Sequence, residues 1–142
     1  METEGILGAV YAKLAADGDV SSFAVSIGVE HPQDTDPANL SVFPYITFSA
    51  SASNPFDDKD TVGEAIVVQV TPWGRGTGTK SATKQVAEGA DFIHAALHRA
   101  TLTATGTNII NCLYQSSPGI IEDPDGFTKY RPMLFSITYQ EA

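Results

Sequence analysis

Cysteine and histidine are scarce in this chain, and their scarcity removes several kinds of chemistry. The 142 residues include one cysteine and three histidines, so no internal disulfide can form. No histidine lies near Cys112 in the sequence, whereas a catalytic thiol needs a positioned base. Cys112 alternates with Ile110 and Tyr114 on one face of a predicted strand. We therefore expect a small, buried hydrophobic side chain in a protein of a reducing compartment.

The chain also lacks long apolar runs and has few basic residues. Its apolar runs are far too short to span a bilayer, which argues against a membrane protein. Eight Lys and Arg stand against 17 Asp and Glu, which gives a net charge of −9. This balance argues against tight, nonspecific binding to nucleic-acid phosphates, because such binding needs clustered bases. The acidic start, Met1–Glu4, differs from the positively charged start of a secretory signal and predicts a cytosolic protein.

No nucleotide-binding motif is complete. Gly74–Ser81 lies between a predicted strand and a predicted helix, where a phosphate-binding loop would stand. In a P-loop, glycine directly precedes lysine so that backbone amides and the ammonium group converge on one phosphate. Thr79 separates Gly78 from Lys80 here, and it also breaks the dinucleotide-binding glycine pattern. We expect a flexible connector and no nucleotide cofactor.

Metal-binding patterns are incomplete as well. His94 and His98 are one helical turn apart, but Ala95 stands where a zinc-protease helix has its glutamate. We expect two surface histidines. Asp123–Gly126 lacks the further oxygen ligands and the closing glutamate of a calcium loop, and it predicts a hairpin turn. With no nucleophile, metal or cofactor site, the sequence predicts a protein that is not an enzyme.

The chain does contain a regular series of apolar patterns with helical or strand spacing. The predicted elements are a helix at Gly5–Ala16, strands at Ser22–Val29, Val42–Ala50 and Thr61–Thr71, a helix at Ser81–Arg99, and strands at Thr107–Gln115 and Phe127–Gln140. The series predicts one α+β domain over residues 1–142. It would be a mostly antiparallel sheet with two main helices, in the order α-β-β-β-α-β-β.

Some positions in this series predict more than secondary structure. Both faces of Thr61–Thr71 are partly apolar, so we expect a central strand that helices or a partner cover on both sides. Ser49–Asp60 is polar and contains Asn54-Pro55, which predicts an unusually long hairpin loop with a role in binding. Pro132 predicts a sheet edge or a bulge in the last strand. Trp73, beside glycines, caps the edge of the core or, if exposed, marks an interface.

The order and spacing of these elements resemble the tail-completion, or tail terminator, proteins of long-tailed, siphovirus-like phages and of phage-derived gene transfer particles. The resemblance covers nearly the whole chain. It rests on the N-terminal helix, Phe43-Pro44-Tyr45-Ile46, Val67-Val68-Gln69-Val70 leading to Trp73, the helix to Leu97, and the closing strand with Tyr130-Arg131-Pro132.

The resemblance implies a virion protein at the tail–head junction, made in the host bacterial cytoplasm. Such a protein forms a homohexameric ring on the head-proximal end of the tail tube, ends tube growth, and joins the head connector or head-closure protein. DNA would pass through the ring without specific binding, because excess negative charge would line the channel. We expect contacts with tube or connector from these residues: Asp57, Asp58, Asp60, Trp73, Glu122, Asp123 and Asp125.

Two other readings remain open from the sequence. Another neck or tail component, such as a head-closure or tail tube protein, would share most of these features. A small ligand-binding domain would instead need a concave pocket lined by converging polar groups, and the sequence offers no residue set for one.

Overall fold

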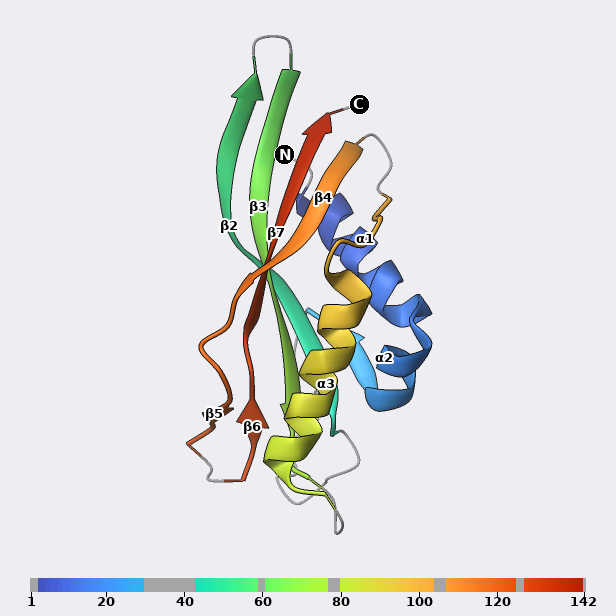
Figure 1. Cartoon of the computed structure of the whole chain (residues 1–142), viewed down its shortest axis with the longest axis vertical. Helices are drawn as coiled ribbons and strands as arrows, with labels where there is room; N and C mark the ends of the chain where they lie inside the picture. The colour runs from blue at the N-terminus through green and yellow to red at the C-terminus, as the bar shows by residue number, and fades with distance from the viewer. Residues whose placement is uncertain are drawn as a thin grey trace.

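The protein is a strongly twisted sheet with helices on one side (Figure 1). The computed structural model describes residues 3–29, 43–58, 61–76, 80–103, 107–124 and 127–141. The helices are α1 (Thr3–Ala16), α2 (Gly18–Phe23) and α3 (Ala82–Leu97). The strands are β1 (Ser26–Gly28), β2 (Tyr45–Asp58), β3 (Thr61–Gly74), β4 (Thr107–Ser116), β5 (Ile121–Glu122), β6 (Lys129–Tyr130) and β7 (Met133–Glu141). The α+β class is confirmed.

Strand β3 is central, as predicted. On one side it pairs with β2 from Trp73 to Thr61, with a bulge between Ala50 and Ala52 of β2. On the other side it pairs first with β7 and then, near its end, with β6. Strand β4 pairs with β7, and β5 pairs with β6, so these four strands extend the sheet on the far side of β3. All these pairs are antiparallel, whereas the short β1 runs parallel to β2.

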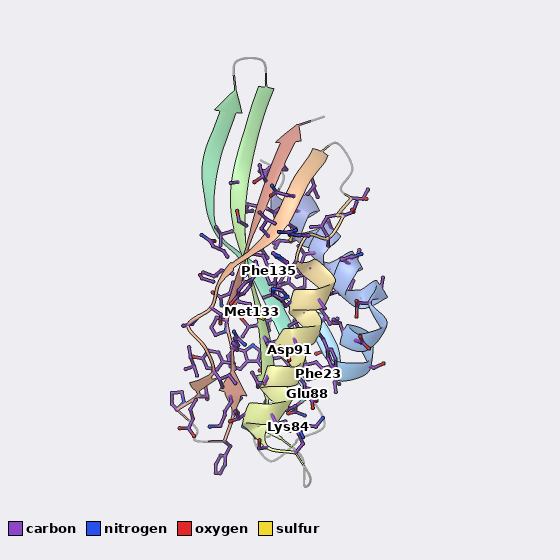
Figure 2. The ribbon with its side chains drawn as sticks, viewed as in Figure 1. Phe23, Lys84, Glu88, Asp91, Met133 and Phe135 are labelled. Atoms are coloured by element: carbon purple, nitrogen blue, oxygen red, sulfur yellow. The ribbon has the colours of Figure 1, made fainter. Side chains whose placement is uncertain are left out.

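The core lies between one face of the sheet and the helices. Every second residue of the central strands is buried there, and the same core includes the inner residues of α1 and α3. The buried strand residues are Ile46, Phe48, Ile66, Val68, Val70, Cys112, Met133, Phe135, Ile137 and Tyr139. Met133 and Phe135 are seen beside α3 in Figure 2. We call this the helix face of the sheet, and the opposite side the open face.

Helix α3 follows its predicted pattern. Its inner residues Val86, Ala90, Ile93 and Leu97 are buried at the spacing of an amphipathic helix. The Ser81 side chain caps the first turn by accepting a hydrogen bond from the Lys84 N–H at 3.1 Å. Lys84, Glu88 and Asp91 follow one another along the helix in Figure 2.

The strand predicted at Ser22–Val29 is correct only at Ser26–Gly28. Helix α1 ends at Ala16 as expected, but Gly18 begins a second helix instead of a turn. The Asp17 carboxylate accepts hydrogen bonds from the N–H groups of Asp19 and Val20, both at 3.0 Å. This N-cap starts α2. The helix extends through Phe23 and so includes the first two residues of the predicted strand.

The hairpin loop predicted at Ser49–Asp60 is also wrong. Strand β2 continues through Asp58, which pairs with Thr61, so the two strands form one long hairpin (Figure 1). The backbone ladder forms although this stretch has no apolar pattern, because its hydrogen bonds do not depend on side-chain type. Pro55 is tolerated because β1 covers β2 only at Tyr45–Thr47, so within the described residues β2 is an edge strand at Pro55.

The last predicted strand, Phe127–Gln140, is divided in two. Arg131 and Pro132 separate β6 from β7. Proline cannot donate to a ladder, and the Arg131 N–H instead donates to the carbonyl oxygen of Pro72 at 3.3 Å. On the side away from β3, the pairing with β4 ends at Leu134 and the pairing with β5 ends at Tyr130. Pro132 lies between them at a local edge of the sheet, as predicted.

Candidate functional site

The structure shows no cluster of metal-ligating side chains among the residues that it describes. No three His, Cys, Asp or Glu side chains in this part of the chain gather closely enough to hold a metal ion. Cys112 is fully buried, as predicted, and burial raises the pKa of its thiol from 9.0 to about 11. A thiol with such a pKa is almost entirely protonated at neutral pH, so it is a poor nucleophile.

The prediction that the two histidines of α3 are surface side chains is wrong. His94 and His98 are half-buried and stack with ring centroids 4.8 Å apart. His98 Nδ1 accepts a hydrogen bond from the Tyr114 N–H at 3.0 Å, and the next residue, Arg99, donates its N–H to the Cys112 carbonyl oxygen at 2.7 Å. Both bonds fall on the outer edge of β4. The end of α3 therefore occupies backbone groups that would otherwise be open to another strand.

Trp73 belongs to a row of aromatic rings that crosses the open face at one end of the sheet. Its ring stacks between Tyr45 of β2, at 5.8 Å, and Tyr130 of β6, at 4.3 Å. These are cross-strand neighbours in register, and such aromatic pairs stabilise a sheet. The indole Nε1–H donates to Thr47 Oγ1 at 3.0 Å. Trp73 thus caps one end of the sheet, which is the structural alternative that the sequence offered.

Two residues of the glycine-rich connector, Arg75 and Gly76, form contacts beside this row. The Gly76 N–H donates to Gln85 Oε1 at 2.9 Å, and Gly76 has a φ of 84°, a conformation that suits glycine. Arg75 Nε donates to the buried Thr128 hydroxyl at 2.8 Å, and its guanidinium lies 5.0 Å from the centre of the Phe43 ring. Arg75 therefore joins the end of β3 to the segments before β2 and β6, in place of holding a phosphate.

The acidic turn after β5 lies at one end of the molecule. Strands β5 and β6 pair as a small hairpin, and half of the turn predicted at Asp123–Gly126 lies outside the described residues. Glu122 forms an ion pair with Lys129 at 3.7 Å, and the Asp123 N–H donates to the Thr128 carbonyl oxygen at 2.8 Å. Asp125 lies outside the described residues. Two apolar side chains are exposed here: Ile120, directly before β5, and Phe127, 72% exposed, in the segment between β5 and β6.

The acids of the long hairpin lie at the other end. Asp57 and Asp58 are the last residues of β2, opposite Val62 and Thr61. Asp60 lies outside the described residues. The structure thus separates the two predicted acidic groups, at the ends of β2 and β5, to opposite ends of the elongated molecule (Figure 1).

Sequence reasoning missed the open face of the sheet, which carries no charge at those positions of its central strands whose side chains the structure describes. Its side chains alternate with those of the core and come from four neighbouring strands. They are Thr47, Ser49, Ala65, Val67, Gln69, Asn111, Leu113, Leu134, Ser136 and Thr138, together with Thr71, which is buried. None is an acid or a base, although the chain has 17 acids. The sequence signal was an uncharged residue at every second position of β3, from Ala65 to Thr71, and of β7, from Leu134 to Thr138.

A comparison with known protein families identifies the family of this chain. The family model of tail completion protein gp17 matches residues 8–140. The chain belongs to this family. It is therefore a structural protein of phage tails, in agreement with the resemblance found in the sequence. No similarity to curated protein sequences reaches significance.

A solved structure has the same fold. A chain from the virion of a native gene transfer agent particle aligns with a TM-score of 0.80 and 14% identity. The alignment covers 97% of each chain, so the fold is shared from end to end. Among the described residues, none of the helices has the length and apolar character needed to cross a membrane.

Proposed function

We propose that this tail completion protein is a tail terminator. Six copies form a ring on the head-proximal end of the tail tube, end its polymerisation, and present the surface to which the head connector or head-closure protein binds. The family match over residues 8–140 carries this proposal. The fold shared with a chain of a gene transfer agent virion supports it.

The shape of the subunit suits a component with two different neighbours. One end is the tip of the β2–β3 hairpin, where Asp57 and Asp58 end β2. The other end is the β5–β6 hairpin, where an acid is paired with Lys129 and Phe127 is exposed. Because the two ends differ in charge and polarity, each fits a different partner, the tube on one side and the connector on the other.

The net charge of −9 supports passage of DNA through the ring without adhesion. Attraction to phosphates requires bases arranged along the path of the duplex. We place an excess of acids at the channel, and a map of an assembled ring with those acids only on its outer rim would contradict this part of the proposal.

The main experiment removes the protein from a phage that depends on it. Particles made without it should have overlong tails and heads that remain unattached.

The purified protein provides a second measurement. Mass measurement and negative-stain imaging, alone and with tail tubes, should find closed rings of six copies. Open-ended polymers of the purified chain would instead identify a tube protein. Turnover of a small molecule would identify an enzyme.

A second experiment tests the hairpin end. Lysine in place of Asp57, Asp58 and Asp60 reverses the charge of this region and should impair head–tail joining, read as the yield of complete particles. Lysine in place of Asp91, an exposed acid of α3, serves as the charge-matched control for one such substitution. Normal particle yield from the triple variant would remove the hairpin acids from the joining surface.

A further inference from the structure

The open face of the sheet is an extended neutral surface on an acidic protein. Leu113 is 38% exposed there, and its cross-strand neighbour Ser136 is flanked on the other side by Val67. Both Ser136 and Val67 are half-buried. Within the described residues, the helices all pack against the opposite face (Figure 1).

The size of this face suits a protein–protein contact. Four strands spaced by ~4.8 Å give a width of about 19 Å. The β3–β7 pairing runs over eight residue pairs, from Gly63–Gln140 to Val70–Met133, and a strand rises by ~3.3 Å per residue. The resulting area of about 500 Å² is more than half of the ~800 Å² that each partner contributes to a standard interface.

The edges of the sheet are less suited to self-association. On β4, the carbonyl oxygen of Cys112 and the N–H of Tyr114 are bonded to the end of α3. On β2, strand β1 covers the first residues, and Pro55 lacks an N–H further along. Both edges therefore resist the addition of a strand from a second molecule.

We propose that the open face, centred on Val67, Leu113 and Ser136, is the surface through which one copy of this chain contacts the next. The charge of the chain indicates that the partner on this face is a second copy. Two copies that each carry a net charge of −9 repel one another, and contact costs least through a surface without acids. DNA finds no base on this face to attract its phosphates. The inference rests on the proposed ring and names the surface that closes it.

The test places one positive charge at the centre of the face. Ser136→Lys should raise the concentration needed for half-assembly at least tenfold, measured by sedimentation alone and on tail tubes, because the charge would be buried without a partner. Ala95→Lys adds the same charge at an exposed position of α3 and should assemble like the wild type. Circular dichroism and thermal unfolding verify that both variants fold.

A second readout does not depend on introducing a charge. The thiol of Leu113→Cys should be alkylated readily in the monomer and at least tenfold more slowly in the assembled protein. Equal alkylation rates in the two states would overturn the inference, as would wild-type assembly by Ser136→Lys.

The outcomes separate this inference from the proposed function. If the wild type assembles into rings and Ser136→Lys assembles equally well, the ring stands and the open face is not its interface. If Ser136→Lys forms normal rings but no longer binds tail tubes, the face belongs to a different protein and the inference fails. If the wild type stays monomeric even on tubes, the ring itself is refuted.

Discussion

The two faces of strand β7 differ sharply although their residues alternate along one short segment. Phe135 and Ile137 are fully buried against the helices, while Leu134, Ser136 and Thr138 are only half-buried on the open face. The helix face holds the fold together, so its side chains are constrained by packing. The open face contributes less to folding, so packing in the core does not explain why its side chains are uncharged. A role in association would explain it. We therefore expect substitutions on the first face to change stability and those on the second to change association.

The largest effect should come from Phe135→Ala. The rings of Phe135 and Tyr114 pack edge to face with centroids 5.7 Å apart, and Phe135 is among the largest fully buried side chains. Removing a buried phenylalanine typically costs about 3–5 kcal/mol, through lost burial and the cavity left behind. Urea denaturation of the monomer should measure this loss. The control is Ser136→Ala, the next residue, which should change the free energy of unfolding by less than ~0.5 kcal/mol. Equal effects at the two positions would remove the distinction between the faces.

Much of the helix face could be predicted from the sequence. The inner residues of α3 and the burial of Cys112 follow from periodic apolar residues, because burial of one side imposes that period. The central position of β3 follows from apolar residues on both of its faces. The prediction failed where no apolar period applies. The outer part of the β2–β3 hairpin is held by backbone pairing, and α2 is set by the Asp17 side chain as its N-cap. Backbone pairing and capping give weak sequence signals compared with core burial.

The open face could not be predicted as a surface. Its residues come from β2, β3, β7 and β4, which are distant in the sequence, and their neutrality appears only when the strand order is known. Likewise, Trp73 stood beside glycines in the sequence, and only the registers of β2, β3 and β6 bring Tyr45 and Tyr130 against it. The acids of the two hairpins are separate groups in the sequence, but only the fold places the ends of β2 and β5 at opposite ends of the molecule.

The next effect concerns Cys112 and pH. Burial keeps the thiol protonated in the folded protein up to a pKa of about 11, whereas the unfolded thiol titrates near 9.0. Stability from this group is therefore complete below pH 9 and is lost as the pH rises toward 11, by about 3 kcal/mol for a shift of two units. Denaturation at successive pH values should show a steeper decline for the wild type than for Cys112→Ala. Parallel curves for the two proteins would contradict the assigned burial of the thiol. Leu113→Cys, on the open face, should add no such pH dependence.

Two glycines provide a smaller contrast on the helix side. A Cβ atom on Gly89 of α3 would lie 2.4 Å from the Phe23 ring of α2, whereas one on Gly8 of α1 would meet nothing within 4 Å. Gly89→Ala should destabilise the protein by ~1–2 kcal/mol, because displacement of Phe23 outweighs the gain in helix propensity. Gly8→Ala should stabilise it by up to ~1 kcal/mol. Thermal unfolding should therefore shift in opposite directions, and a stabilising Gly89→Ala would mean that Phe23 moves aside at little cost.

The smallest effect should come from the aromatic row, where the open face does contribute to folding. Trp73→Phe keeps a ring between Tyr45 and Tyr130 but removes the donor to Thr47 Oγ1, and Thr47→Val removes the acceptor. A hydrogen bond of this kind contributes ~0.5–1.5 kcal/mol, so the coupling energy from a double-mutant cycle should fall in that range. The chain has one tryptophan, and unfolding must be followed by circular dichroism because Trp73→Phe removes it. A coupling energy near zero would mean that ring stacking alone fixes Trp73, and that this end of the open face is held by aromatic contact without the indole hydrogen bond.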